Sequence, residues 1–248
     1  MQRDLTRSYR GSFLGLVWLV LGPLLMVILY TLVFSKVLGL RFHQTDSVTN
    51  YGLYVYCGLL PFQAFSDALN KSVTSIRTNS TLVKRVVFPL EILPMTTAAT
   101  AFVGQFFGFG ALMVLQIVLE HHLQWTLLLI PIIAVPQLLF MLGLSYLISV
   151  AGAYMPDLKD SLRAFLRGFM FATPIIWPAS RVPEDSPMRP FIDFNPLAFI
   201  SSAYRDLVLS GDLPSLGGLL LFTLFAATVC LVGVTLFARI KRQFADLI

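Results

Sequence analysis

The sequence predicts an all-α membrane protein that forms a single transmembrane domain, residues 1–248, with six transmembrane helices. Two observations lead to this prediction. The chain is 56% hydrophobic and only 12% charged, whereas soluble domains contain about 25% charged residues. Its Lys and Arg residues gather at the ends of long apolar runs, as in the loops that flank membrane spans.

An amphipathic interface helix is expected at the N-terminus, before the first span. Arg3, Arg7 and Arg10 recur at helical spacings of four and three, with Tyr9 elsewhere on the turn. A basic amphipathic stretch of this kind suits a helix that lies among the lipid headgroups. A disordered tail is the alternative.

The six predicted spans are residues 13–40, 51–70, 95–119, 126–154, 162–177 and 216–238. About 20 residues cross the hydrocarbon core, so the first span is long enough to tilt and the fifth is short enough to need neighbouring helices. We expect Pro23 to kink the first span, Gly58 and Pro61 to interrupt the second, and Pro174 to interrupt the fifth.

Between the second and third spans lies NSTLVKRVVFPLEILP, residues 79–94, which is too polar to cross a membrane. Asn79 is a good helix N-cap and Pro89 disfavours helix just before it, so about three turns are available. Such a helix has one face made of Leu82, Val83, Val86 and Val87. Its other face is made of Thr81, Lys84, Arg85 and Phe88. We expect its exposed surface to dock a partner that supplies energy; an amphipathic loop resting on the lipid interface is the alternative.

A long segment that is not an obvious span, residues 178–214, precedes the last span. Prolines crowd its first half. Its second half, residues 197–209, mixes apolar residues with polar ones and is too short to cross the bilayer. We therefore expect a re-entrant or interfacial helix.

The distribution of basic residues sets the orientation. Six spans place both termini on the same side, and that side receives thirteen of the 18 Lys and Arg residues against five on the other. Because basic residues concentrate in cytoplasmic loops, both termini are expected in the cytoplasm.

The sequence contains little chemistry of its own. It has no G-x-x-x-x-G-K-[ST] loop for ATP. The spans contain almost no ionisable residues at mid-membrane depth, which argues against an ion-coupled carrier, although broken helices can bind ions by their backbone alone. No catalytic residue, metal site or bound cofactor is predicted, since Glu120-His121-His122 matches no metalloprotease spacing. An intramembrane enzyme acting on a lipid carrier remains an alternative, but it lacks a candidate acid, base or metal.

Aromatic residues are abundant and suggest a conduit for sugars, whose apolar C–H edges stack on aromatic rings. The candidates for channel-facing residues are Tyr51, Tyr54, Phe62, Phe65, Phe169 and Trp177. Packing against lipid or against the protein core is the alternative for each of them.

Several stretches resemble the membrane subunits of polysaccharide ABC exporters, a family of type-2 ABC exporter permeases, in the same order along the chain. RSYRGSFLGLVWLVLGPLLMVILYTLVFSKVLG resembles the opening of that family, and GLLPFQAFSDAL its second span. NSTLVKRVVFPLEILP resembles its cytoplasmic coupling helix. YMPDLKD resembles a cytoplasmic loop, with Pro156 in place of the usual Arg, and TPIIWP and NPLAFISSAYRDLVLSG resemble the fifth span and the periplasmic helical segment before the last.

The resemblance implies a working unit of two such chains, a homodimer, with two ABC ATPase subunits that bind ATP and Mg, in the bacterial inner membrane. The implied cargo is an O-antigen or capsular polysaccharide linked to undecaprenyl pyrophosphate; teichoic acid, another glycolipid or a drug is the alternative, and no nucleic acid is involved. ATPase coupling is assigned to Asn79, Leu82, Val83, Lys84, Arg85, Val86, Phe88, Glu91, Asp157, Lys159 and Asp160. Headgroup capture is assigned to Arg3, Arg7, Tyr9 and Arg10, and the periplasmic gate to Asn195, Pro196, Tyr204 and Arg205.

Overall fold

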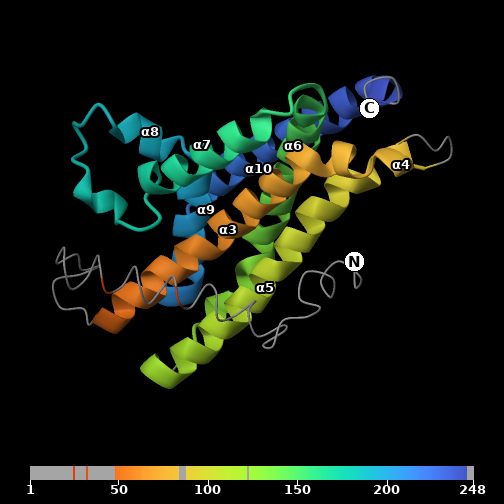
Figure 1. Ribbon diagram of the computed structural model, residues 1–248. Helices are drawn as coiled ribbons and strands as arrows, with labels where there is room; N and C mark the ends of the chain where they lie inside the picture. The colour runs from red at the N-terminus through yellow and green to blue at the C-terminus, as the bar shows by residue number, and fades with distance from the viewer. Residues whose placement is uncertain (1–24, 26–31, 33–47, 84–87, 122, 245–248) are drawn as a thin grey trace. The chain divides into compact units, whose positions relative to one another are not determined.

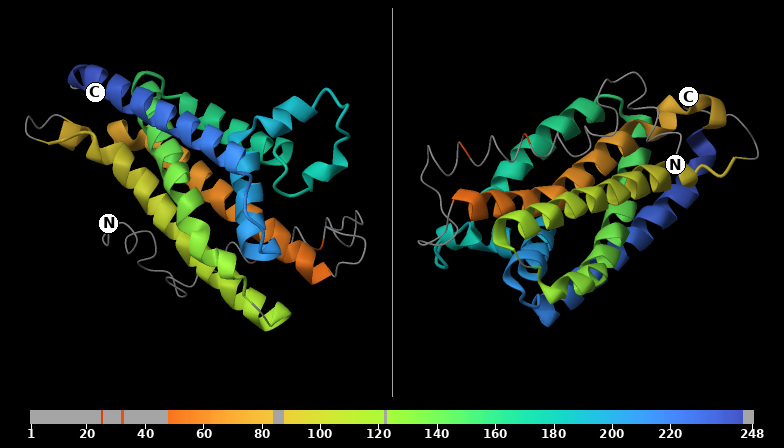
Figure 2. Two further views of the ribbon diagram at one scale, coloured as in Figure 1. Left: turned by 180° about the vertical axis from the view of Figure 1, so that it is seen from behind. Right: turned by 90° about the horizontal axis from the view of Figure 1, so that it is seen from below.

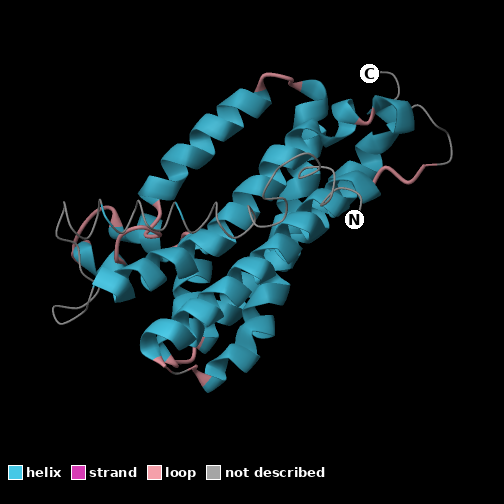
Figure 3. Ribbon diagram, turned by 60° about the horizontal axis from the view of Figure 1, so that its bottom comes forward, coloured by secondary structure: helices cyan, strands magenta, loops and turns pink. Residues whose placement is uncertain are grey.

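The computed structural model describes residues 48–83, 88–121 and 123–244, together with Leu25 and Leu32. Every regular element of this part is helical and no strand occurs in it, which confirms the predicted fold class for these residues (Figures 1 and 3). The predicted N-terminal interface helix lies outside the described residues. So does the first span, residues 13–40, apart from the two leucines.

The long helices are α3 (Val48–Thr78), α5 (Ile92–Glu120), α6 (Ile130–Tyr154), α7 (Leu158–Ala172) and α10 (Leu216–Ile240). Shorter helices and turns connect them: α4 (Ser80–Val83), η3 (Trp125–Leu129), η4 (Ala179–Arg181), α8 (Arg189–Asp193), α9 (Pro196–Arg205), the π-helical turn η5 (Asp206–Ser210) and η6 (Lys241–Gln243).

Three helical stretches of the described chain are long and apolar enough to cross a membrane: Ile92–Val118, Trp125–Tyr154 and Leu216–Gln243. They correspond to the third, fourth and sixth predicted spans. Helix α7 has 15 residues, or about 22 Å at 1.5 Å per residue, which is shorter than a hydrocarbon core of about 30 Å. The six-span topology stays a prediction.

The expected interruption of the second span is wrong. Helix α3 runs unbroken past Gly58 and Pro61 and ends at Thr78, eight residues beyond the predicted boundary at residue 70 (Figure 2). Residues 51–62 are all buried, so neighbouring segments support the helix where Pro61 removes a backbone donor. The expected interruption at Pro174 is confirmed, because α7 ends at Ala172.

The described residues form two compact units. One contains residues 48–62, 104–121, 123–133 and 170–215, and the other contains residues 63–83, 88–103, 134–169 and 216–244. Within the second unit, α6 and α10 meet backbone to backbone: a Cβ atom on Gly233 would lie 2.3 Å from the carbonyl oxygen of Gly143. Only glycine permits this contact.

Candidate functional site

The 79–91 segment, which follows α3 in the second unit, begins differently from the prediction. The Asn79 carbonyl accepts hydrogen bonds from the backbone N–H groups of Leu82 (2.8 Å) and Val83 (3.1 Å), and so starts α4. The Asn79 side chain instead donates to the carbonyl of Ser75 at 2.8 Å, and so provides a hydrogen-bond donor to a carbonyl in the last turn of α3. The side chain therefore caps the preceding helix. Three members of the predicted coupling set, Lys84, Arg85 and Val86, lie outside the described residues.

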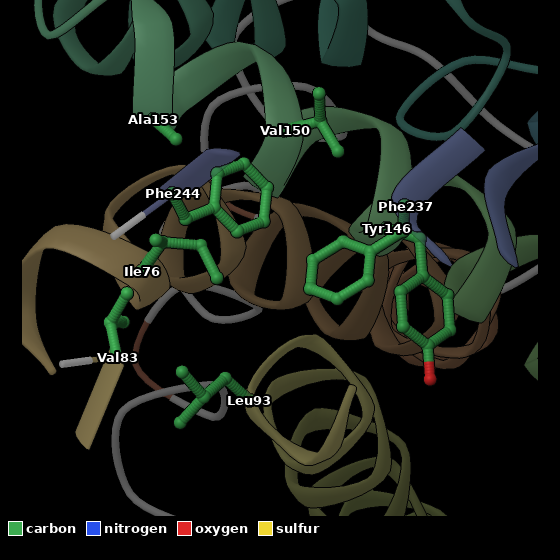
Figure 4. Close-up of a cluster of buried hydrophobic side chains, with 8 residues drawn as sticks. All are labelled: Ile76, Val83, Leu93, Tyr146, Val150, Ala153, Phe237 and Phe244. Carbon is green, nitrogen blue, oxygen red and sulfur yellow. The ribbon is translucent and has the colours of Figure 1, made fainter. Parts of the chain in front are cut away.

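An apolar core, which we call the coupling core, binds this segment to the rest of its unit. It contains the buried side chains of Ile76, Val83, Leu93, Tyr146, Val150, Ala153, Phe237 and Phe244 (Figure 4). Leu82, Phe88, Leu90 and Ile240 pack against it. The predicted apolar face is thus confirmed for Leu82 and Val83, but it packs within the chain.

Two side chains tie α6 to the region of the 79–91 segment. Arg77, at the end of α3, donates to the carbonyl oxygens of Gly152 (3.2 Å) and Ala153 (2.8 Å). These carbonyls belong to the last turn of α6, where backbone acceptors lack helical partners and a cation is favourable. The Tyr146 hydroxyl donates to the carbonyl of Glu91 at 3.2 Å.

The end of the chain also contacts the 79–91 segment. The ammonium group of Lys241 forms an ion pair with the carboxylate of Glu91. The hydrogen bond from Lys241 holds the pKa of Glu91 below its ordinary value, although partial burial opposes the shift. Since about a third of each side chain is exposed, the pair contributes about 0.2–1 kcal/mol, as exposed ion pairs do.

The other predicted coupling residues lie at the start of α7. Asp157, Lys159 and Asp160 are all exposed, and Asp160 forms an ion pair with Arg163 at 3.7 Å. The start of α7 therefore carries three charged side chains that are exposed to solvent. They provide a charged surface where a partner protein can bind.

In the first unit, Arg205 at the end of α9 is buried, with 6% of its surface exposed. Its guanidinium donates to the Tyr54 carbonyl (3.1 Å), the Tyr54 hydroxyl (3.0 Å) and the Pro174 carbonyl (3.0 Å), and also to the carbonyl of Ile175. Gly58 leaves room for it, because a Cβ there would lie 2.2 Å from Nη2 of Arg205. The glycine that suggested an interruption of α3 instead accommodates a buried arginine.

Arg205 therefore provides hydrogen-bond donors to the irregular backbone that follows α7, which we call the break after α7. Residues 173–178 leave carbonyl oxygens without helical partners, and Arg205 binds two of them. The hydroxyl of Tyr51 donates to a third, on Ile176. Irregular backbone at membrane depth needs such partners, because the bilayer core supplies no water.

Asn195 and Pro196 begin α9 as their residue types favour. The Asn195 side chain accepts hydrogen bonds from the backbone N–H of Leu197 (3.0 Å) and of Ala198 (3.4 Å), and Pro196 occupies the first helical position. The same side chain donates to Oγ1 of Thr173 at 3.0 Å. Both ends of α9 are thus hydrogen-bonded to the break after α7.

Side chains from α5 and η3 hold the far end of this segment. Gln116 donates to the carbonyl of Val208 at 2.9 Å, and Thr126 donates to that of Leu207. The ring of Tyr204 lies 4.8 Å from that of Phe109, and its hydroxyl shares a hydrogen bond with the Gln105 side chain. The predicted gate residues therefore lie in one bonded network, built from α3, α5, α9 and the break after α7.

The predicted channel aromatics have packing roles in the described chain. Tyr51, Tyr54 and Phe62 are buried, as is Phe65, whose ring stacks on that of Phe140 at 5.7 Å. Phe169 stacks on Phe165 at 5.3 Å, and Trp177 donates to the carbonyl of Phe171 at 2.9 Å. A channel role for these six residues stays a prediction.

Sequence reasoning missed several residues of these networks: Arg77, Gln105, Gln116, Thr126, Thr173 and Lys241. Gln105 and Gln116 offered a signal, because an amide inside an apolar span marks an interior contact. Lys241 offered no such signal, because basic residues are expected next to any span end that lies in the cytoplasm. Among the described residues no three His, Cys, Asp or Glu side chains gather as metal ligands would.

Known proteins are similar in sequence to this chain over nearly its whole length. The model of the ABC-2 type transporter family matches residues 1–209. The O-antigen export system permease protein RfbA of Myxococcus xanthus is 26% identical over 246 residues, which covers 99% of this chain and 92% of the relative. A protein of the same name from Klebsiella pneumoniae is 28% identical over 249 residues, with the same coverage. The polysialic acid transport protein KpsM of Escherichia coli is 23% identical over 246 residues, covering 93% of this chain and 88% of the relative.

Proposed function

Because this chain belongs to the ABC-2 type transporter family, we propose that it is the membrane subunit of an ATP-driven polysaccharide exporter. In this proposal the cargo is an O-antigen or capsular polymer linked to undecaprenyl pyrophosphate. It moves from the cytoplasm to the periplasm through a pair of these chains in the inner membrane, with both termini of each chain in the cytoplasm. Two copies of a separate ABC subunit bind and hydrolyse ATP with Mg.

The observation that carries the proposal is the end-to-end similarity to proteins named as O-antigen export permeases. The similarity covers almost the full length of this chain and of those relatives, so it extends over both the 79–91 segment and the segment before the last span. A more distant relative is named for polysialic acid transport, which favours a capsular polymer as the second candidate cargo. Both cargoes are long, acidic or neutral glycans that need the same kind of passage.

The geometry supports a division of labour between the two units. In the second unit, the 79–91 segment rests on the coupling core, and the start of α7 presents Asp157, Lys159 and Asp160 to solvent. This is where the ATPase is expected to bind. In the first unit, the segment of Asn195, Pro196, Tyr204 and Arg205 is expected to form the outer gate. The basic residues Arg3, Arg7 and Arg10, with Tyr9, are expected to attract the pyrophosphate headgroup.

Copurification from native membranes tests the proposal. A tagged chain extracted in mild detergent is expected to bring down an ABC ATPase in equal copy number, and the complex in liposomes is expected to move the lipid-linked polymer only when ATP is present. Transport by this chain alone, without an ATPase or nucleotide, would contradict the proposal.

An exposed position gives a sharper test of the ATPase surface than the apolar face of the 79–91 segment, because Val83 is needed for packing. Asp157→Lys is expected to reduce the amount of copurified ATPase several-fold without lowering the melting temperature. Glu184→Lys makes the same charge change at another exposed position and is expected to have no effect. Equal amounts of ATPase with both variants would remove the start of α7 from the docking surface.

A further inference from the structure

The end of the chain contacts the 79–91 segment through two different kinds of interaction. One is the ion pair between Lys241 and Glu91. The other is the burial of Phe244, which is fully inaccessible in the coupling core together with Val83 and Leu93. Both contacts come from one short turn, residues 241–244, which follows α10. We call this turn the C-terminal strap.

We propose that the C-terminal strap makes the 79–91 segment and α10 move together, so that an ATPase pushing on the segment also displaces α10. Lys241 and Phe244 are positioning residues in this proposal, since they act through the segment and not on the cargo. The inference rests on the proposed function and states how a force applied by the ATPase to the 79–91 segment reaches α10.

Chain connectivity means that such a path needs non-covalent contacts, and the strap is the most direct of them. The 79–91 segment is covalently joined only to α3 and α5, and 150 residues separate Glu91 from Lys241. A displacement of the segment therefore reaches α10 only through non-covalent contacts. In the described chain the direct contacts are the strap and the coupling core, and α6 adds an indirect route through the Tyr146–Glu91 hydrogen bond and its close packing on α10.

The two contacts have different mechanical roles. An ion pair that is about one-third exposed contributes about 0.2–1 kcal/mol, too little to carry a load by itself, but it fixes the direction from which the strap approaches. The ring of Phe244 lies 5.5 Å from that of Phe237, which in turn lies 5.2 Å from that of Tyr146. Protein interiors are packed as densely as organic crystals, so these rings couple the strap tightly to α10, through Phe237, and to α6, through Tyr146.

Helix α10 is suited to pass the displacement on. It has 25 residues without an internal proline, or about 37 Å of continuous helix. Its first residue, Leu216, follows closely in sequence on the segment that ends at Ser210. A displacement of α10 therefore acts directly on the covalent connection to the proposed gate segment, which contains Asn195 and Arg205.

A charge swap tests the inference in the complex of this chain with its ATPase. The variants are Lys241→Glu, Glu91→Lys and the two together, with Arg239→Glu as the matched control. Arg239 is exposed, lies two residues before the strap and has the same charge. Lys241→Glu is expected to retain bound ATPase and ATP hydrolysis while it lowers, several-fold, the polymer exported per ATP hydrolysed. Glu91→Lys is expected to lower the same ratio. The double variant is expected to restore most of it, and the control to behave like the wild type.

A second measurement separates this inference from the proposed function, because it needs no polymer. Adding nucleotide to the wild-type complex is expected to change backbone hydrogen exchange both in residues 79–83 and in residues 237–244. In Lys241→Glu the change is expected to remain in residues 79–83 and to disappear from residues 237–244. If both regions still respond in that variant, or if the double variant exports no better than the single ones, the strap does not carry the displacement. A wild-type complex that exports no polymer but shows the paired exchange response would contradict the cargo and keep the strap.

Discussion

The guanidinium of Arg205 lies over the ring of Tyr54, 3.6 Å from its centre, and also donates to the hydroxyl and the backbone carbonyl of that same residue. One tyrosine thus provides three of the contacts that keep a cation inside an apolar bundle. The remaining two hydrogen bonds of Arg205 go to carbonyl oxygens in the break after α7. All four hydrogen-bond partners of the arginine are neutral groups.

Replacing Arg205 is expected to destabilise the protein strongly. Arg205→Met leaves buried carbonyls of Pro174 and Ile175 without donors, and each unsatisfied group costs about 1–3 kcal/mol. Arg205→Lys is expected to be only partly tolerated, because an ammonium group cannot match the planar fork of donors. The melting temperature of the purified protein in detergent measures both effects.

Arg181→Met serves as the control for these variants, since Arg181 is exposed in η4. Tyr54→Phe removes only the hydroxyl acceptor and is expected to give a smaller loss than Arg205→Met. If Arg205→Met melts at the same temperature as Arg181→Met, the hydrogen bonds of Arg205 do not hold the break in place.

The close contact of α6 with α10 predicts a steep dependence on side-chain size. Gly233→Ala places a methyl group against the backbone of Gly143, which cannot move aside as a side-chain tip can. Overpacking of this kind costs about 1–3 kcal/mol. Gly217→Ala on the same helix meets no atom within 4 Å and is expected to leave the melting temperature unchanged or slightly raised. A Gly233→Ala protein as stable as Gly217→Ala would show that the two helices do not pack this closely.

Phe244 is expected to be a major contributor to the coupling core. Its side chain is fully buried, and Phe→Ala in a core costs about 3–5 kcal/mol. Arg242→Ala, two residues earlier and exposed, is the control. Chemical or thermal unfolding of both variants measures the difference, and a loss no larger than that of the control would place Phe244 outside the core.

The long apolar helices were predictable because their signal is local. The predicted spans at residues 95–119, 126–154 and 216–238 coincide, to within a residue or a few at each end, with helical stretches that are long and apolar enough to cross a membrane. Composition and length decide such spans, since a bilayer requires about 20 apolar residues whatever the neighbours are. The break at Pro174 was predictable for the same reason, because proline acts on its own backbone.

The contacts of the site were not predictable, because they depend on partners far away in sequence. Gly58 and Pro61 looked like breakers of α3, yet the helix continues through both and Gly58 makes room for Arg205. Asn79 has the residue type of an N-cap, whose side chain accepts a hydrogen bond from the helix that follows it. Its side-chain NH2 group instead donates to the carbonyl of Ser75 in the preceding helix. Nothing near Lys241 in the sequence shows that it pairs with Glu91.

The ion pair of Glu91 with Lys241 predicts a pH dependence of stability that one substitution removes. The folded protein holds the pKa of Glu91 below its ordinary value, which is about 4.3 in an unfolded chain. Stability from the pair is therefore fully present above that ordinary value and is lost as the pH falls through the lowered pKa of the folded state. Melting temperatures of wild type and Glu91→Gln are expected to differ by a constant amount from neutral pH down to about 5, and to converge as the pH falls through the lowered pKa of Glu91 in the folded state. High salt is expected to narrow the gap, since about a third of each side chain is exposed. A gap that widens as the pH falls would mean that the folded state favours protonated Glu91, the opposite of what its pairing with Lys241 predicts.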